Sequence, residues 1–293
     1  MMKQRVYMLG CVVCATACPA IASHLDREAV DAMVRDATEP VAVESGSDEP
    51  ICIPRDHRWT VSFEPSIWVP ALQGEIGVGG SPVFDVDAID IDENEATPFG
   101  RFFIRSGDLS IEFSGFSFNN DQTATASAPV TIGGTGVGAG GAVAYDLTMT
   151  SFELTAGYRL WTLPVGKNNP DIEKATDDLE VWIDGYAGVR GFEVDLDFST
   201  PAGVSQGLED IHAIVGVSLN MDLPNDFGVR FSADGGGGSG GSSFDFTVSF
   251  DYEVVEHVTA QIGYRYLRTD LEDNGFTYDV ALAGLFASVA IRF

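Results

Sequence analysis

The stretch that decides the fold runs from Ser243 to the last residue and reads SFDFTVSFDYEVVEHVTAQIGYRYLRTDLEDNGFTYDVALAGLFASVAIRF. Counted back in twos from its end, the residues are apolar: Phe293, Ile291, Val289, Ala287 and Leu285. The residues between them form a mixed, partly polar set. Alternation with a period of two is what a β-strand shows when its faces meet different surroundings. The same pattern covers 258–267 and 244–252, so the stretch predicts three consecutive strands.

Three details of these strands favour a membrane barrel over the alternative, a secreted soluble sandwich. The apolar face is rich in aromatic residues near the strand ends, and the opposite face carries charges. A barrel with a lipid-facing wall and a polar lumen requires both features. The third detail is Phe293, preceded by Val289 and Ile291 in the same strand. It is typical of the terminal signal that the barrel-assembly machinery reads.

The first 58 residues differ from the rest of the chain. Residues 1–22 read as a signal peptide, with a basic start, an apolar centre over 6–17 and an Ala20-Ile21-Ala22 cleavage site. A lipoprotein signal cut before Cys18 is the alternative. Residues 23–58 contain an acidic segment with Pro, Gly and Ser, which favours disorder. We interpret them as a partly disordered periplasmic leader or linker, and the protein as exported to the cell outer membrane.

Charge and cysteine content exclude several classes of protein. Lys and Arg number 16 against 44 Asp and Glu, which gives a formal net charge of −28. A nucleic-acid partner is therefore not expected, because it requires a basic surface. Three of the four cysteines fall in the signal peptide and only Cys52 remains. The mature chain can form neither an internal disulfide nor a cysteine zinc site.

The sequence predicts an all-β fold, a transmembrane antiparallel up-and-down barrel over residues 59–293 with about ten strands and a small or plugged lumen. Apolar parity slips by one residue at Gly115 and at Gly191, as a β-bulge would cause. The ten strands are expected at 59–67, 99–105, 109–118, 147–160, 181–198, 211–223 and 227–233 and in the three segments of the final stretch.

The connections between these strands are expected to alternate in length. Short turns are predicted at 106–108, 224–226 and 253–257. Long loops are predicted at 71–98, 119–146, 234–242 and 269–279. Outer-membrane barrels have short periplasmic turns and long external loops. The pattern therefore places both barrel ends in the periplasm, with 161–180 as an unusually long periplasmic connection.

A Gly-x-Arg triplet recurs on four expected strands, and its Gly and Arg share the inner face. Glycine leaves space in a narrow lumen, and a buried arginine needs an anion because an unpaired buried charge is costly. Either a salt-bridged lumen plug or an anion-conducting site follows, and a ten-stranded barrel favours the plug. The expected lumen charge network consists of Arg159, Arg190, Arg230, Arg265, Glu112, Glu153, Asp184, Asp245 and Asp251.

Other candidates for chemistry are weaker. The acidic run with Asp85, Asp87, Asp90 and Asp92 offers oxygen ligands for Ca²⁺ but lacks the order of an EF-hand, so a solvated acidic loop is favoured. The Gly-rich segments 133–141 and 235–241 are not nucleotide-binding loops, since neither opens a helix. They indicate flexible external loops or close backbone approach at the barrel mouth.

Catalysis would need a histidine near the outer rim, and only His212 qualifies, with Asp210 and Ser205 nearby in sequence. Nothing in the spacing demands a catalytic arrangement. A lumen histidine with satisfied hydrogen bonds is the simpler interpretation. We expect no enzyme, no catalytic residue and no cofactor.

At this point the sequence resembles a bacterial outer-membrane β-barrel family of unassigned function. The resemblance rests on SIWVPALQGEIGVGG (66–80), DVDAIDIDENE (85–95), the Gly-rich SADGGGGSGGSS (232–243), FDY (250–252), GYRYLRTD (263–270) and the terminal Phe. It covers most of 59–293 and implies architecture and topology, with no catalytic residue. The family commonly has a tryptophan in the strand after the Gly-rich loop, where this chain has Phe244 or Phe246.

Two functions of different classes follow. The first is an integral outer-membrane barrel with a structural or surface-interaction role and acidic external loops. The alternative is a narrow channel or transporter for a small solute or ion. Expected partners are outer-membrane lipid, lipopolysaccharide and the barrel-assembly machinery, with divalent cations at the external loops as a further hypothesis.

The terminal signal gives a first prediction. Deleting Phe293 should lower the amount of protein in the outer membrane far more than the loss of one buried ring explains, because burial of such a ring contributes only about 1.5–3 kcal/mol. Quantitative immunoblotting of outer-membrane fractions measures this. Unchanged levels of the truncated protein would argue against a role in assembly.

Overall fold

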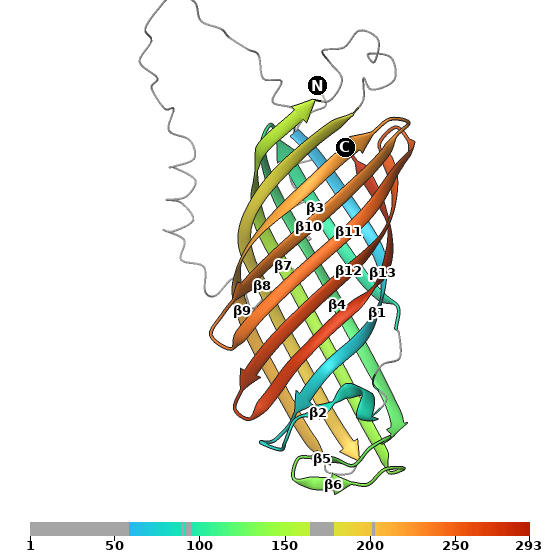
Figure 1. Cartoon of the computed structure of the whole chain (residues 1–293), viewed down its shortest axis with the longest axis vertical. Coiled ribbons are helices and arrows are strands. Elements are labelled where there is room, and N and C mark those ends of the chain that lie inside the picture. Colours follow the sequence, from blue (N-terminus) through green and yellow to red (C-terminus); the bar gives the residue numbers. More distant parts are fainter. Residues whose placement is uncertain (1–58, 90, 92–94, 165–178, 201–202) are drawn as a thin grey trace, which may run out of the picture. The chain divides into compact units, whose positions relative to one another are not determined.

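The computed structural model describes residues 59–89, 91, 95–164, 179–200 and 203–293 (Figure 1). The expected signal peptide (1–22) and leader (23–58) lie outside the described residues.

Ten long antiparallel strands form a closed barrel in which each strand pairs with its neighbours in sequence and β13 pairs back onto β1. This confirms the predicted fold class. The last residue helps to close the ring, because the Phe293 N–H donates to the Val61 carbonyl at 2.8 Å. The barrel strands are β1 (Trp59–Gly77), β3 (Thr97–Ser106), β4 (Leu109–Thr125), β7 (Ala142–Pro164), β8 (Glu180–Thr200), β9 (Val204–Leu223), β10 (Phe227–Gly237), β11 (Gly241–Val255), β12 (Val258–Asp273) and β13 (Phe276–Arg292).

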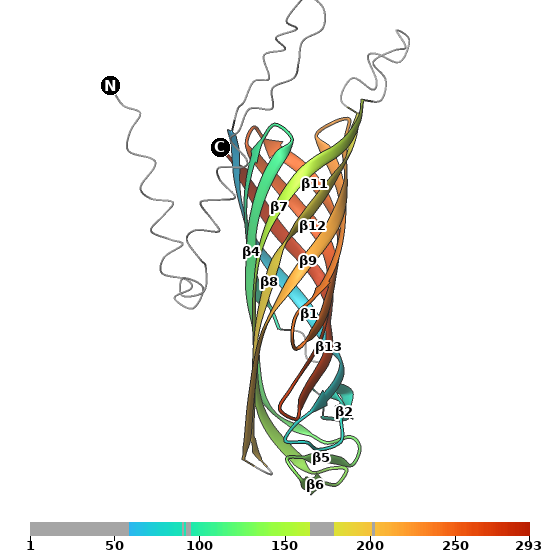
Figure 2. The same ribbon diagram turned by 90° about the vertical axis from the view of Figure 1, so that its left-hand side faces the viewer.

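The two rims of the barrel differ. The near rim holds the start of β1, the end of β13 and the turns at 107–108, 224–226 and 256–257, which confirms the predicted short turns. The far rim holds the turns at 238–240 and 274–275 and two larger insertions, which lie together at the bottom of Figure 2. One insertion contains β2 (Phe84–Asp85) and the short 3₁₀ helix η2 (Val86–Ile89). The other carries the hairpin of β5 (Val130–Ile132) and β6 (Thr135–Val137).

In the half of the barrel next to the near rim, the outward face is apolar and the inward face is polar. On β12, Ile262 and Tyr264 are exposed outward, while Gln261 and Arg265 are buried inside. Aromatic residues gather outside this rim: Trp59, Tyr158, Trp161, Phe227, Tyr252 and Phe293. The outward apolar band includes Phe63, Ile67, Ile111, Phe113, Leu154, Val189, Val215, Val217, Phe250, Ile262, Leu285 and Val289.

In the half next to the far rim, the two faces exchange character. On β8, Val194, Leu196 and Phe198 point inward and are buried, while Asp195 and Asp197 point outward and are exposed. Inward residues of the other strands complete an apolar core, among them Leu72, Ile76, Phe118, Leu147, Met149, Leu267, Leu271, Tyr278 and Val280. Burial raises the pKa of the Tyr278 phenol, whose hydroxyl donates to Met149 Sδ at 3.5 Å. The far half is therefore built like the inside of a water-soluble β-barrel.

This exchange corrects the expected bulges at Gly115 and Gly191. Both glycines sit in unbroken register, with Phe152 opposite each of them. Before Gly115 the apolar residues Ile111 and Phe113 face outward, and after it Phe116 is buried inside. The slip in apolar parity therefore marks the level at which the apolar side chains move from the outer face to the inner face, and the strand itself does not bulge there.

The exchange also corrects two of the predicted long loops. Residues 234–242 and 269–279 are mostly strand, with turns of a few residues at 238–240 and 274–275. Of the two interpretations offered for the Gly-rich segment 235–241, the close approach of neighbouring backbones is the one that the structure shows. A Cβ added at Gly236 would lie 2.0 Å from the Ala213 carbonyl oxygen. These segments carry acidic residues outside and small or apolar residues inside. The resulting composition is similar to that of loops, which is why the sequence predicted loops there.

At the height of the outward apolar band every barrel strand is paired on both sides, and such a band on a closed wall requires lipid. A water-soluble protein would not leave a band of this size exposed. The chain is thus an integral β-barrel of the outer membrane, with the near half in the bilayer. No helix among the described residues is long and apolar enough to cross a membrane.

The exchange of faces predicts that a lysine introduced on the outer face of one strand lowers stability by an amount that depends on its position along the strand. Val215 and Ser205 both point outward from β9 and are exposed, ten residues apart. Val215→Lys should lower the free energy of unfolding by about 2–4 kcal/mol, because lysine would enter lipid. Ser205→Lys should change it by less than about 0.5 kcal/mol, as expected for a surface site. Urea unfolding in lipid vesicles measures both, and equal costs would contradict the assignment.

Candidate functional site

The most enclosed charge in the barrel is the Arg190 guanidinium on β8, whose side chain is 1% exposed. Its Nη2 and Nε donate to Glu153 Oε2 on β7 at 2.6 and 3.0 Å. Its Nη1 lies 2.9 Å from Asp234 Oδ1, and Nη2 lies 3.4 Å from Asp245 Oδ2. The Arg190 guanidinium on β8 therefore contacts carboxylates on three other strands, β7, β10 and β11. Without this positive charge, burying those carboxylates would be costly.

Arg265 on β12 extends this layer. It donates two hydrogen bonds to Asp245 Oδ2, from Nη2 at 2.6 Å and Nε at 3.0 Å. Its guanidinium carbon also lies 4.8 to 5.4 Å from the ring centroids of Phe99, Trp68 and Phe116. Cation–π contact suits a guanidinium at the boundary between a charged layer and an apolar one. Arg265 therefore marks the level where the polar interior of the near half meets the apolar core.

Three more arginines line the interior beside Arg190 and Arg265. Arg101 on β3 contacts Glu112 at 2.8 Å through Nε and Glu64 at 3.3 Å through Nη1. Nearer the near rim, Arg105 pairs with Asp184 at 2.5 Å. Arg159 lies 3.5 Å from Asp184 and 3.8 Å from Glu180. We call Glu64, Arg101, Glu112, Glu153, Arg190, Asp234, Asp245 and Arg265 the ion-pair layer.

Two predicted members of the lumen network stand apart from these contacts. Arg230 lines the interior, but no carboxylate among the described residues lies within 4.0 Å of it, which corrects the expectation that each of the four repeat arginines has such a partner. Asp251 also lines the interior and accepts a hydrogen bond from Gln261 Nε2 at 2.7 Å. Arg159, Arg190 and Arg265 do contact acids.

Sequence reasoning missed Arg101, Arg105 and Asp234. The two arginines lie in TPFGRFFIRS, where aromatic residues occupy both faces and hide the alternation. They share the parity of Phe99, so a count from that residue could have found them. Asp234 was assigned to an external loop, whereas it lies in β10, opposite Asp245 in the register.

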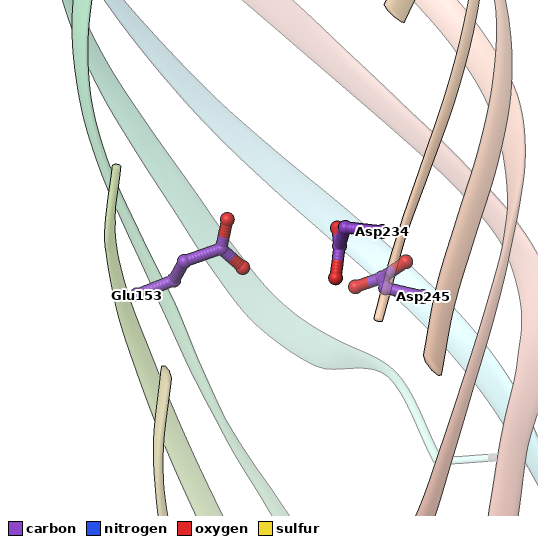
Figure 3. A group of neighbouring side chains, drawn as sticks. All are labelled: Glu153, Asp234 and Asp245. Atoms are coloured by element: carbon purple, nitrogen blue, oxygen red, sulfur yellow. The ribbon is translucent and has the colours of Figure 1, made fainter. Parts of the chain in front are cut away.

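Figure 3 shows Glu153 reaching from one wall towards Asp234 and Asp245 on another. Ligand oxygens of these three residues lie within 4.8 Å of one another, a spacing that would suit a metal ion. The Arg190 guanidinium contacts all three, however, and supplies the positive charge they need. We therefore assign the group to an ion pair.

The acidic run near the far rim has a different use. Asp85 Oδ1 accepts the N–H of Asp87 at 3.0 Å and so caps η2. The neighbouring Val86, Ile89 and Ile91 are fully buried and cover the apolar core. Asp90 and Asp92 lie outside the described residues.

His212 lies on the inner face of β9, fully buried. Its ring nitrogens lie 2.8 Å from Ser243 Oγ and 3.0 Å from Asp210 Oδ2. Ser205, the serine that the sequence offered, points outward instead. Asp210 also accepts the Gly240 N–H at 2.9 Å and the Ser239 hydroxyl at 3.1 Å. The group thereby fastens the β10–β11 turn onto β9.

The near half contains a cavity of about 730 Å³. Its lining runs from residues at the near rim, such as Asp226 and Arg292, to Arg190 and Arg265 in the ion-pair layer. Beyond that layer, towards the far rim, the interior is filled by the apolar core. Two successive obstacles, one charged and one apolar, therefore close the interior over the described residues.

No protein-family model matches the chain, and no curated protein sequence matches it. Solved structures of similar fold include the outer-membrane protease OmpT of Escherichia coli, at 11% identity over 82% of this chain and 98% of that one, with a TM-score of 0.45. Neisserial surface protein A is 14% identical over 80% and 97%, with a TM-score of 0.33. Ail, the attachment invasion locus protein of Yersinia pestis, is 11% identical over 79% and 99%, with a TM-score of 0.30. Likeness at this level concerns the barrel fold and carries over no activity.

The ion-pair layer predicts that replacing a buried arginine costs much more unfolding free energy than replacing an exposed one. Arg190→Met should lower the free energy of unfolding by about 3–5 kcal/mol, because it leaves buried carboxylates without a counter-charge. Arg268→Met is the control, since Arg268 pairs with Asp279 on the exposed outer face and should cost about 0–1 kcal/mol. Urea unfolding in vesicles compares the two. Similar values would show that the buried contacts do not hold the barrel together.

Proposed function

We propose that the protein is a non-conducting surface barrel, with its near rim in the periplasm and its far half standing outside the bilayer on the cell surface. The observation that carries this proposal is the closed interior: Arg190 and Arg265 hold the charged layer, and the apolar core fills the space beyond it. An apolar core without a continuous polar path offers an ion no replacement for its water shell.

The orientation follows from the asymmetry of the barrel. In outer-membrane barrels, short turns face the periplasm and larger connections face outward. The insertions with η2 and with the β5–β6 hairpin are at the far rim, so this rim is external. The outward acids of the far half then meet the lipopolysaccharide layer, where divalent cations would bridge carboxylates to anionic sugars.

A narrow transporter is the second candidate, and one observation favours it. The cavity of about 730 Å³ includes near-rim residues in its lining and has the size of a small-molecule site. Transport would require the ion-pair layer and the apolar core to open together. A surface role needs no such rearrangement.

Conductance in a planar bilayer separates the two functions. We expect no steady channel from the wild-type protein. Arg265→Ala should lower stability in denaturant and leave the conductance near zero, because the apolar core still closes the barrel. A steady, well-resolved channel in the wild type, with ion selectivity shifted by Arg265→Ala, would overturn the proposal and favour transport.

A further inference from the structure

The first residues of β9, at the far rim, have a β-neighbour on one side only. β8 pairs with β9 from Val204 to Asp222, but β10 reaches only as far as Ala213, opposite Gly237. Residues 204–212 thus have no second strand beside them among the described residues. In Figure 1 the orange β10–β11 turn stops well short of the end of the gold β8–β9 hairpin.

The backbone of this segment is open on its free side. Apart from the ladder with β8, no backbone hydrogen bond within the described chain involves residues 204–209. Alternate N–H and C=O groups of an edge strand point away from the sheet and pair readily with an added strand. The six residues of this free segment, 204–209, span about 20 Å at the usual rise per residue.

The edge is held in place, which lowers the entropy that a partner must overcome. Leu208 is buried in the apolar core on the inward side. At the inner end of the free segment, Asp210 holds the β10–β11 turn through Gly240 and Ser239. The β10–β11 turn is therefore held next to the space where a strand could pair with residues 204–209.

The charges around the edge define the partner. Glu209 on β9 lies directly opposite Glu193 on β8, and Asp197 lies opposite Asp146 on β7, all exposed on the outer face. Like charges directly opposite each other destabilise a sheet. The outer face of 193–199 and 203–209 carries no lysine or arginine. A second copy of the same acidic edge would be repelled, whereas a cationic strand would relieve the repulsion.

We propose that the free edge of β9, residues 204–209, binds an extended peptide segment with basic residues at alternate positions, which adds to the sheet as a further strand. Its basic side chains face outward beside Glu209, with Glu193 one strand further away, and its small or apolar side chains face the core side. This inference rests on the proposed function, since it requires the far half to stand outside the bilayer.

The probe is a capped nine-residue peptide in which lysine alternates with valine, added to the full-length protein in nanodiscs. Fluorescence anisotropy measures binding, and amide hydrogen exchange locates it. We expect saturable one-to-one binding with new exchange protection confined to residues 204–209. A peptide N-methylated at alternate residues should bind at least about tenfold more weakly, because it cannot complete the ladder.

Charge reversals test the acidic flank. Glu209→Lys should weaken binding at least about tenfold, because like charges then meet across the new strand pair. Glu75→Lys makes the same change at an exposed outward site on β1 and should leave affinity within about twofold.

Three results would overturn the proposal: equal binding of the N-methylated peptide, protection elsewhere than 204–209, or dimerisation of the protein through this edge. Each leaves the conductance of the barrel untouched, so failure here is distinguishable from failure of the proposed function.

Discussion

Every side chain of a closed β-barrel faces either in or out, and the surroundings of the outer face change along each strand from lipid to water. Apolar residues must therefore occupy the outer face within the bilayer and the inner face beyond it. The strands of this protein obey that constraint by exchanging the two sets of residues near Gly115 and Gly191, with no break in register. The barrel, its buried charges and its closed interior all follow from this exchange.

At the level of the exchange, charges of the near half meet the apolar core of the far half. A guanidinium at this level is buried away from water and needs a negative partner. Arg190 and Arg265 both pair with carboxylates, and aromatic rings also surround Arg265. The same contacts join strands that are far apart in sequence, from β7 to β12. The ion-pair layer thus both closes the interior and connects strands across it.

The sequence predicted the barrel, its ten strands and its near-rim turns, because period-two alternation is strong where lipid faces one side. It predicted inward arginines through the Gly-x-Arg repeat, but no described carboxylate lies within the 4.0 Å salt-bridge distance that was expected for Arg230. The far half was read as loops, since acids outside and small or apolar residues inside give a composition rich in Gly, Asp and Ser. For that reason Asp234 was not identified as an interior residue from the sequence. Its contact with Arg190 forms only when the sheet closes into a barrel and brings β8 and β10 together.

The most direct test of the exchange of faces is a spin-label scan of the outward residues of β9, in a variant with Cys52 replaced. Labels are placed in turn at Ser205, Gly207, Glu209, Ile211, Ala213, Val215 and Val217, and power saturation compares access of oxygen with access of a water-soluble nickel complex. The account predicts access by nickel at 205–209 and a change to access by oxygen alone by 215. Lipid-like access along the whole series, from 205 to 217, would contradict it.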